Sequence, residues 1–214
     1  MQTEATEMYL ITVYRLTRKA PRASTKQIAS MLDVSPPSVS ERIKRLAEQG
    51  LLNHEWREGT TLTAQGERIA INVLRKHRLI ETFLVDMAGY GLDEIHDEAC
   101  KIEHAISERL ADQLAAMLGN PQVDPHGHPI PSKQGAVTTL DYQSLADVAV
   151  GKSVIVRQVS DWDREQLGYL TDLGLTPGTA VTVLDRAPFD GPLTLKVAET
   201  TVALSRAMAE EIGV

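Results

Sequence analysis

The sequence is poor in cysteine, because Cys100 is the only one among its 214 residues. A single thiol cannot form an internal disulfide, so it must be buried, reactive or a metal ligand. The motifs HExxH and CxxC are both absent, which argues against a zinc protease and a zinc finger. No stretch approaches the roughly 18 apolar residues of a membrane span, and the N-terminus lacks the pattern of a signal peptide. We therefore expect a cytoplasmic protein.

Positive charge is scarce overall, since the chain has a formal net charge of −7. Its distribution is uneven. Residues 1–78 hold 13 Lys and Arg against 8 Asp and Glu, whereas residues 79–214 hold 9 against 21. The first part thus carries a net charge of +5 and the second −12. A basic lobe on an acidic protein indicates that the N-terminal part faces nucleic acid.

Four residues near the middle of the chain are all metal-ligand types: His96, Cys100, Glu103 and His104. On one continuous helix they would fall within an arc of about 100°. Upstream, His77 and Glu81 form a second pair one helical turn apart. Thiolate and imidazole suit first-row transition metals, because calcium and magnesium prefer oxygen ligands. The set therefore indicates a site for iron, manganese, cobalt, nickel or zinc. The alternative is a pair of solvated helix faces.

The first 63 residues have the order of a winged helix-turn-helix. Apolar periodicity predicts helices over residues 4–19, 26–32 and 36–49, and Ser24 with Gln27 fits a capping box before the second. The segments LLNHEW and TLT flank REGT, which predicts a short hairpin with a glycine in its turn. Each element alone is weakly informative, but the ordered set is typical of this DNA-binding fold.

Two long helices are predicted next, over residues 64–87 and 93–118. The second carries an apolar stripe that fits an intramolecular core and a dimer seam equally well: Ile102, Ile106, Leu110, Leu114 and Met117.

Residues 119–150 contain four prolines, which predicts a linker or irregular loop. We expect His126 and His128 to lie there in an exposed polar turn and not to bind metal. From about residue 151, short β-branched runs around one short helix predict a small β-barrel of roughly 60 residues.

This order of parts resembles the diphtheria toxin repressor family of metal-dependent transcriptional regulators. The resemblance covers residues 1–131 and is carried by ATEMYLITVYRL, LDVSPPSVSERIKRLAEQGLL, RKHRLIETFL and, most specifically, HDEACKIEHAISERL. The implied fold class is mainly α with small β. Its implied parts are a winged helix-turn-helix DNA-binding domain, a helical metal-binding and dimerisation domain, a linker and an SH3-like β-barrel, over residues 1–70, 71–131, 132–150 and 151–214.

The resemblance also implies two metal sites. The primary, activating site would use Met8, Cys100, Glu103 and His104. The ancillary site would use His77, Glu81 and His96, with Asp163 and Gln166 from the third domain. Manganese-type members carry carboxylates at the positions of Met8 and Cys100. The soft sulfur pair found here therefore implies iron, since sulfur is a poor ligand for hard manganese.

The same comparison implies that the recognition helix reads operator DNA from its N-terminal end. The residues expected at the major groove are Ser35, Pro37, Ser38, Ser40 and Glu41. The candidate phosphate contacts are Lys26, Arg42, Lys44 and Arg57, because cations supply affinity while base edges supply sequence choice. Glu41 stands where iron repressors carry Gln. Its carboxylate accepts hydrogen bonds but cannot donate them, which predicts a changed operator preference.

We therefore predict a homodimeric repressor of metal-uptake genes, activated by ferrous iron, with one or two dimers on each double-stranded operator. The alternative of the same fold is a manganese-dependent regulator, and cobalt, nickel or zinc could act as surrogates. A metal-independent winged-helix regulator is a further alternative. A metallohydrolase is the rival from another class, but Met and Cys ligands serve an open catalytic metal poorly. We predict no catalytic residues and no enzyme activity.

Overall fold

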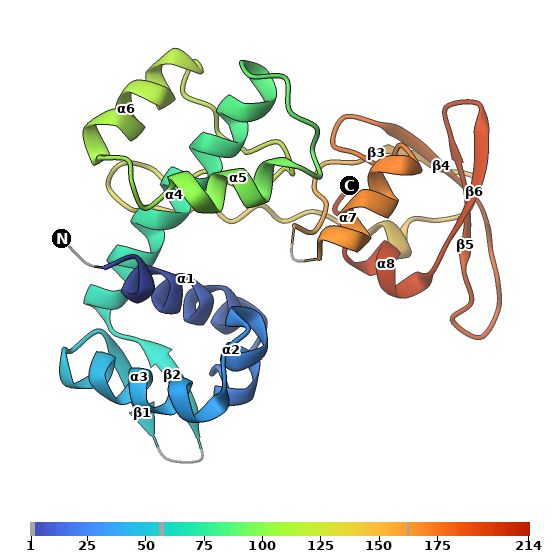
Figure 1. Cartoon of the computed structure of the whole chain (residues 1–214). Coiled ribbons are helices and arrows are strands. Elements are labelled where there is room, and N and C mark those ends of the chain that lie inside the picture. The colour runs from blue at the N-terminus through green and yellow to red at the C-terminus, as the bar shows by residue number, and fades with distance from the viewer. Residues whose placement is uncertain (1–2, 56–57, 162) are drawn as a thin grey trace. The chain divides into compact units, whose positions relative to one another are not determined.

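The computed structural model describes residues 3–55, 58–161 and 163–214. Its N-terminal and middle parts are mainly helical and its C-terminal part is a small β-sheet domain, which confirms the predicted fold class (Figure 1). The chain forms two compact units. The first contains the residues up to 77 with 101–112 and 131–136, and the second contains 78–100, 113–130 and 137–214. No helix among the described residues is long and apolar enough to cross a membrane.

The first unit begins with the predicted winged helix-turn-helix (Figure 1). Its elements are α1 (Glu4–Lys19), α2 (Thr25–Leu32), α3 (Pro36–Glu48), β1 (Leu52–Glu55) and β2 (Gly59–Leu62). The two strands pair antiparallel to form the wing. The helices pack around a core in which Leu10, Ile28, Ile43 and Leu46 are fully buried. This core fixes α3 and presents its other side to solvent.

Local capping explains where these helices begin. Ser24 and Gln27 form the predicted capping box at α2, each side chain bonding the backbone of the other. Ser35 caps α3 by accepting a hydrogen bond from the backbone N–H of Ser38. After α3, Gly50 has φ +71°, a left-handed conformation that glycine adopts without strain. These boundaries were predictable because each depends on neighbours in sequence.

The middle helices are α4 (Ala64–Asp86), α5 (Ile95–Ile102) and α6 (Glu108–Met117). The prediction of one continuous helix over residues 93–118 is wrong. Ser107 begins α6 anew, because its hydroxyl and carbonyl accept hydrogen bonds from the N–H groups of Leu110 and Ala111. Two of the expected ligands, residues 103 and 104, therefore lie in a turn beyond the end of α5.

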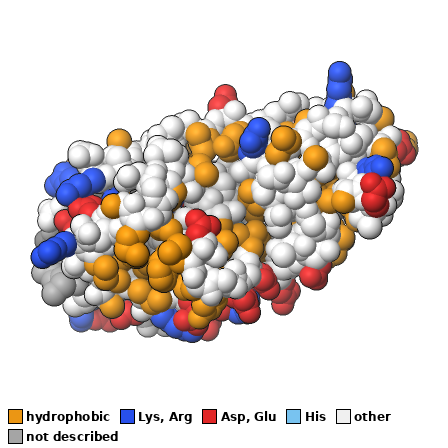
Figure 2. All heavy atoms as spheres, turned by 90° about the horizontal axis from the view of Figure 1, so that it is seen from above, with side chains coloured by type: hydrophobic (Ala, Val, Ile, Leu, Met, Phe, Trp, Pro, Cys, Tyr) orange, Lys and Arg blue, Asp and Glu red, His pale blue; other side chains and the backbone are white. Residues whose placement is uncertain are grey.

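The apolar stripe on these helices is only partly buried. Ile102, Ile106 and Leu114 are half-buried, whereas Leu110 and Met117 are 46% and 65% exposed. Figure 2 shows hydrophobic side chains gathered on one face of the molecule. The stripe is therefore not a fully buried intramolecular core.

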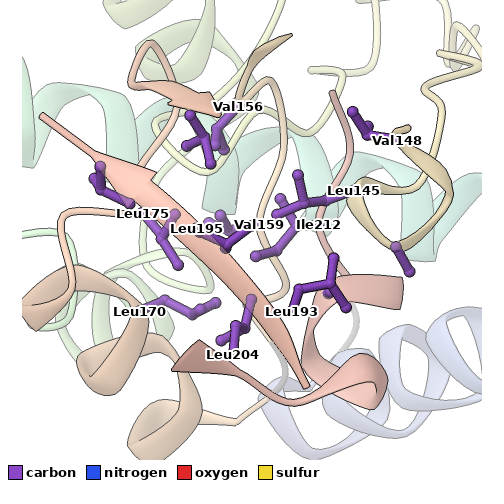
Figure 3. Close-up of a cluster of buried hydrophobic side chains, with 14 of the residues drawn as sticks. Leu145, Val148, Val156, Val159, Leu170, Leu175, Leu193, Leu195, Leu204 and Ile212 are labelled. Atoms are coloured by element: carbon purple, nitrogen blue, oxygen red, sulfur yellow. The ribbon is translucent and has the colours of Figure 1, made fainter. Parts of the chain in front are cut away.

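The second unit contains the C-terminal sheet. Its four strands pair antiparallel in the order β3 (Ser153–Ile155), β4 (Ala180–Arg186), β5 (Leu193–Val197) and β6 (Thr200–Leu204). Three short helices accompany the sheet: the 3₁₀-helix η1 (Leu145–Asp147), α7 (Arg164–Asp172) and α8 (Arg206–Glu210). Figure 3 shows the buried aliphatic side chains that hold these elements together. Helix α8 was not predicted, because five residues are too few to show helical periodicity.

The proline-rich segment 119–150 is mostly irregular, as predicted, but it is not an exposed turn around its histidines. His126 is fully buried and the His128 side chain is 12% exposed, so that expectation is wrong. The Asp124 carboxylate accepts hydrogen bonds from the N–H groups of both histidines, which closes a tight loop. Gly127 in this loop has φ +89°, and a Cβ there would lie 1.9 Å from the Arg157 carbonyl oxygen. Only glycine fits at this position, and the loop can therefore pack closely against the backbone at Arg157.

Candidate metal centre

A buried chain of carboxylates and imidazoles lies in the first unit. The Glu103 carboxylate is 2.5 Å from His77 Nδ1 and 3.1 Å from His104 Nε2. The other ring nitrogen of His104 lies 2.6 Å from the carboxylate of Glu7 on α1. The side chains are between 1% and 14% exposed. Buried charges are costly unless they are paired, so this cluster is built to hold positive charge between carboxylates.

The electrostatics of this cluster confirm that preference for positive charge. Burial raises the pKa of Glu103, but the hydrogen bonds and charges of His104 and His77 outweigh it and lower the pKa to about 2. The hydrogen bond to Glu103, supported by Glu7 and opposed by burial, raises the pKa of His104 to about 9. At neutral pH the imidazole of His104 therefore carries an added proton, and with it one positive charge, between the two carboxylates. A divalent cation would compete with that proton.

A second cluster lies in the second unit. His96 and Cys100 are one turn apart on α5, with Nε2 and Sγ 3.6 Å apart. The other ring nitrogen of His96 is 3.6 Å from Glu81 Oε1, and Glu81 Oε2 is 3.8 Å from His126 Nδ1. The Glu81 side chain is fully buried. One carboxylate on α4 thus faces imidazoles from two different segments.

The turn at residues 124–128 contributes a group that can hold a metal ion. Ligand atoms of Asp124, His126 and His128 all lie within 4.8 Å of one another. The Nδ1 atoms of both histidines are buried and make no hydrogen bond among the described residues. These nitrogen atoms instead face carboxylates at ion-pair distance, His126 at 3.8 Å from Glu81 and His128 at 3.7 Å from Asp124, an arrangement that suits a transition-metal ion.

Charge also gathers around this turn. Burial raises the pKa of Asp124. Burial lowers the pKa of His126, but the carboxylate of Glu81, followed by Asp124 and Asp161, outweighs it, so that the pKa is raised. Sequence reasoning missed this group, because the prolines around it suggested a solvated loop. The pattern Asp-x-His-x-His at 124–128 was the signal that could have found it.

The side-chain pairs do not follow the expected division into two sites. His77 of the expected ancillary set pairs with Glu103 of the primary set. Cys100 of the primary set lies beside His96 of the ancillary set. Met8 is half-buried in the first part of α1, one residue after Glu7. Together these residues offer sulfur, nitrogen and oxygen donors. Their division between two metal ions remains a prediction.

The two ligands expected from the third domain have other local roles. Asp163 is exposed and caps α7, accepting hydrogen bonds from the N–H groups of Glu165 and Gln166 at 2.9 and 3.1 Å. Gln166 is half-buried on that helix. Asp161, two residues earlier, is the carboxylate from this part of the chain that acts on His126. A metal role for Asp163 and Gln166 remains a prediction.

The structure places most of the expected DNA contacts on the solvent side of the winged helix-turn-helix. The exposed residues are Lys26, Ser35, Pro37, Ser38, Ser40, Glu41 and Lys44. Glu41 forms an ion pair of 2.5 Å with Arg45 on the same helix. Arg42 is half-buried and donates a hydrogen bond to Thr6. Arg57 lies outside the described residues.

Models of three protein families match the chain. The "Iron dependent repressor, N-terminal DNA binding domain" matches residues 1–60. The "Iron dependent repressor, metal binding and dimerisation domain" matches residues 63–132. The "FeoA domain" matches residues 143–214. The chain thus combines a DNA-binding part, a metal-binding and dimerisation part and a FeoA part.

Relatives support the same assignment. The chain is 34% identical to the iron-dependent repressor IdeR of Mycobacterium tuberculosis over 223 residues, covering 99% of this chain and 96% of that protein. It is 30% identical to the diphtheria toxin repressor of Corynebacterium diphtheriae over 202 residues, 90% and 88% of the two chains.

Two solved structures are also similar. A manganese-dependent transcriptional repressor in complex with manganese has a TM-score of 0.84 and 38% identity, with 97% of each chain covered. ScaR with bound Cd²⁺ has a TM-score of 0.82 and 33% identity, again with 97% of each chain covered. Identity at this level over nearly the whole chain shows that it belongs to the diphtheria toxin repressor family, whose members are metal-dependent transcriptional repressors and not enzymes.

Proposed function

We propose that this protein is a ferrous-iron-activated repressor of metal-uptake genes that binds double-stranded operator DNA as a homodimer, with one or two dimers on each operator. The observation that carries the choice of iron is the soft pair Met8 and Cys100 in the expected activating site. Titration of operator binding with ferrous and manganous ions side by side, under anaerobic conditions, tests it.

The donor set fits a transition-metal ion. Cys100 Sγ lies beside an imidazole, and the carboxylates of Glu81 and Glu103 are buried with imidazoles around them. When bound there, a divalent cation would supply compact positive charge beside these buried carboxylates. Manganese is the alternative metal, since similar solved structures include manganese-dependent repressors. Cobalt, nickel and zinc are surrogates, because all bind imidazole and thiolate.

Exposed apolar residues on α6 support the proposal of a dimer. Leu110 and Met117 lie in the part of the chain matched by the metal-binding and dimerisation model. We place the dimer seam on this face, because a two-fold dimer presents two recognition helices to the two halves of an operator. We also propose that the chain divides these tasks by domain. Residues 1–70 bind DNA, residues 71–131 bind metal and form the dimer, and residues 151–214 form the SH3-like domain.

The turn at 124–128 would contribute to the ancillary site. We expect Asp124→Asn and His126→Gln each to weaken Co²⁺ binding at one site by roughly 10–100-fold, the range for residues that support a metal. Asn at 124 keeps an oxygen that can accept the two N–H bonds of the loop. Titration of the metal-free full-length protein with Co²⁺, followed by absorption, measures the effect.

The matched control for this titration is His54→Gln, which removes an imidazole on β1 whose Nδ1 lies 3.0 Å from the hydroxyl of Thr60 in the wing. It should leave Co²⁺ binding as it is in the parent. An unchanged number of sites and unchanged affinities in both the Asp124 and His126 variants would remove the turn from the metal centre.

Glu41 should set operator choice. The carboxylate is exposed near the start of α3 and cannot donate to a base. Glu41→Gln should tighten DNA binding in general, because it removes a negative charge near phosphates, and should shift preference at one base pair per half-site. Such discriminating contacts are worth ~1–3 kcal/mol each. Binding-site selection on both proteins measures the shift, and identical selected motifs would mean that Glu41 points away from the bases.

A further inference from the structure

Arg42 connects the recognition helix to the first turn of α1. Its Nη2 donates hydrogen bonds to the hydroxyl oxygens of Thr6 at 2.8 Å and Thr3 at 3.4 Å. Thr6 is buried, with only 4% of its surface exposed. The Arg42 Nε is also buried and has no hydrogen-bond partner among the described residues. The side chain is therefore drawn into the protein instead of extending toward solvent as Lys44 does.

The two threonines are themselves part of the helix start. Thr3 is the N-cap of α1 and accepts a hydrogen bond from the Thr6 N–H, and the two hydroxyls lie 2.9 Å apart. A cation at a helix N-terminus is unfavourable with respect to the helix dipole. Specific hydrogen bonds to the capping hydroxyls must therefore account for the position of Arg42. The geometry of the cap and the position of the guanidinium depend on each other.

The same turn of α1 belongs to the metal centre. Glu7 follows Thr6 in sequence, and its carboxylate lies 2.6 Å from His104 Nδ1. Met8, an expected ligand, is the next residue. One turn of backbone thus connects His104, an expected ligand, at one end with Arg42 on α3 at the other, and all of these residues lie in one compact unit. A shift of this turn caused at Glu7 must be felt at Arg42, because a helix turn moves as a unit.

We propose that Arg42 is a positioning residue that transmits the state of the metal centre to the recognition helix through its hydrogen bonds to Thr6 and Thr3. This inference rests on the proposed function, because it explains how metal occupancy changes DNA affinity. The competing role is a phosphate contact, the role also expected of the exposed Lys44 on the same helix. The two roles predict different results, since a phosphate contact contributes with or without metal, whereas a positioning residue acts on the difference between the two states.

The test compares full-length proteins on one operator, selected from random DNA by the metal-loaded parent. For each protein the dissociation constant is measured by fluorescence anisotropy with saturating Mn²⁺ or anaerobic Fe²⁺ and with a chelator. The ratio of the two constants is the coupling factor, expected at about 5–150 for the parent. We expect Arg42→Gln and Thr6→Val each to lower this factor by about fivefold or more. The double variant should lose no more than Arg42→Gln alone, because Thr6→Val removes one of the two hydrogen bonds that Arg42→Gln already removes.

Two further variants serve as controls. Thr6→Ser keeps the hydroxyl and should keep the coupling factor of the parent. Lys44→Gln removes an exposed cation from the same helix and should weaken DNA binding equally with and without metal, leaving the factor unchanged. Thermal unfolding and Mn²⁺ affinity in the absence of DNA, measured for each variant, show that the fold and the metal sites are retained.

The inference is overturned if Arg42→Gln behaves like Lys44→Gln, with an equal loss in both states and a salt dependence reduced by about one phosphate contact. It is also overturned if Thr6→Val leaves the coupling factor intact. A parent protein with a factor of one would contradict the proposed function as well. A parent with a large factor that Arg42→Gln retains would contradict this inference alone.

Discussion

Chelation of the purified protein should weaken operator binding by about 5–150-fold, and ferrous ion added under anaerobic conditions should restore it. The physical reason lies in the buried cluster of Glu103, His104 and Glu7, where the carboxylates otherwise depend on an imidazolium for compensation. A bound cation would change the interaction between the Glu7 carboxylate and His104. The first turn of α1, which carries Glu7, would change with it. Fluorescence anisotropy or a gel shift on the selected operator measures the change.

Linkage provides an independent check of this result. If metal tightens DNA binding by a given factor, operator DNA must tighten metal binding by the same factor. Calcium serves as the control ion, because it prefers oxygen ligands and should restore nothing in a site rich in imidazole and sulfur. Equal operator affinity with metal and with chelator would instead support a metal-independent winged-helix regulator, with the His and Cys cluster as packing.

The parts of the fold that could be predicted are those that depend on residues close in sequence. The capping box of Ser24 and Gln27, the serine before α3 and the glycine after it each define a helix boundary without help from the rest of the chain. The β-branched runs after residue 151 likewise predicted short strands, and the structure forms β3 to β6 there. Apolar periodicity therefore located nearly every element of the winged helix-turn-helix and the sheet.

The break between α5 and α6 shows where this reasoning fails. Residues 93–118 have helical periodicity throughout, but α5 ends at Ile102 and the bonds that Ser107 accepts begin a new helix. A helical projection across this break places Glu103 and His104 on the wrong face, so it could group the ligands but not pair them. Their partners, His77 and Glu7, come from other helices, and periodicity in one sequence does not reveal contacts between helices.

The prediction of an exposed turn around His126 and His128 failed for a related reason. Proline and glycine around them are typical of solvated loops. The loop is instead closed by Asp124, which bonds two N–H groups, and Gly127 lets it pass close to the Arg157 carbonyl. Burial of His126 and His128 depends on this packing against a segment some 30 residues later. It also depends on Glu81 from α4, which lies 3.8 Å from His126 Nδ1.

The choice between iron and manganese should depend on two side chains. Met8→Asp combined with Cys100→Glu replaces both soft sulfur ligands by hard carboxylates, the ligand type that suits manganese. We expect the ratio of activation by Mn²⁺ to activation by Fe²⁺, taken from operator-binding titrations, to rise by about tenfold or more, which corresponds to ~1.4 kcal/mol. Ferrous ion generally binds a given site more tightly than manganous ion, so the ratio and not the absolute affinity is the informative quantity.

Matched variants separate ligand chemistry from added negative charge. Met87→Asp places a carboxylate at an exposed methionine just beyond α4 and should keep the metal preference of the parent. Each single variant, Met8→Asp or Cys100→Glu, should give part of the shift, because the two sulfur atoms would contact one ion. If the double variant still prefers iron as strongly as the parent does, the two sulfurs do not define the activating site. Metal choice must then depend on the nitrogen and oxygen ligands, with His104 and Glu103 as the first candidates.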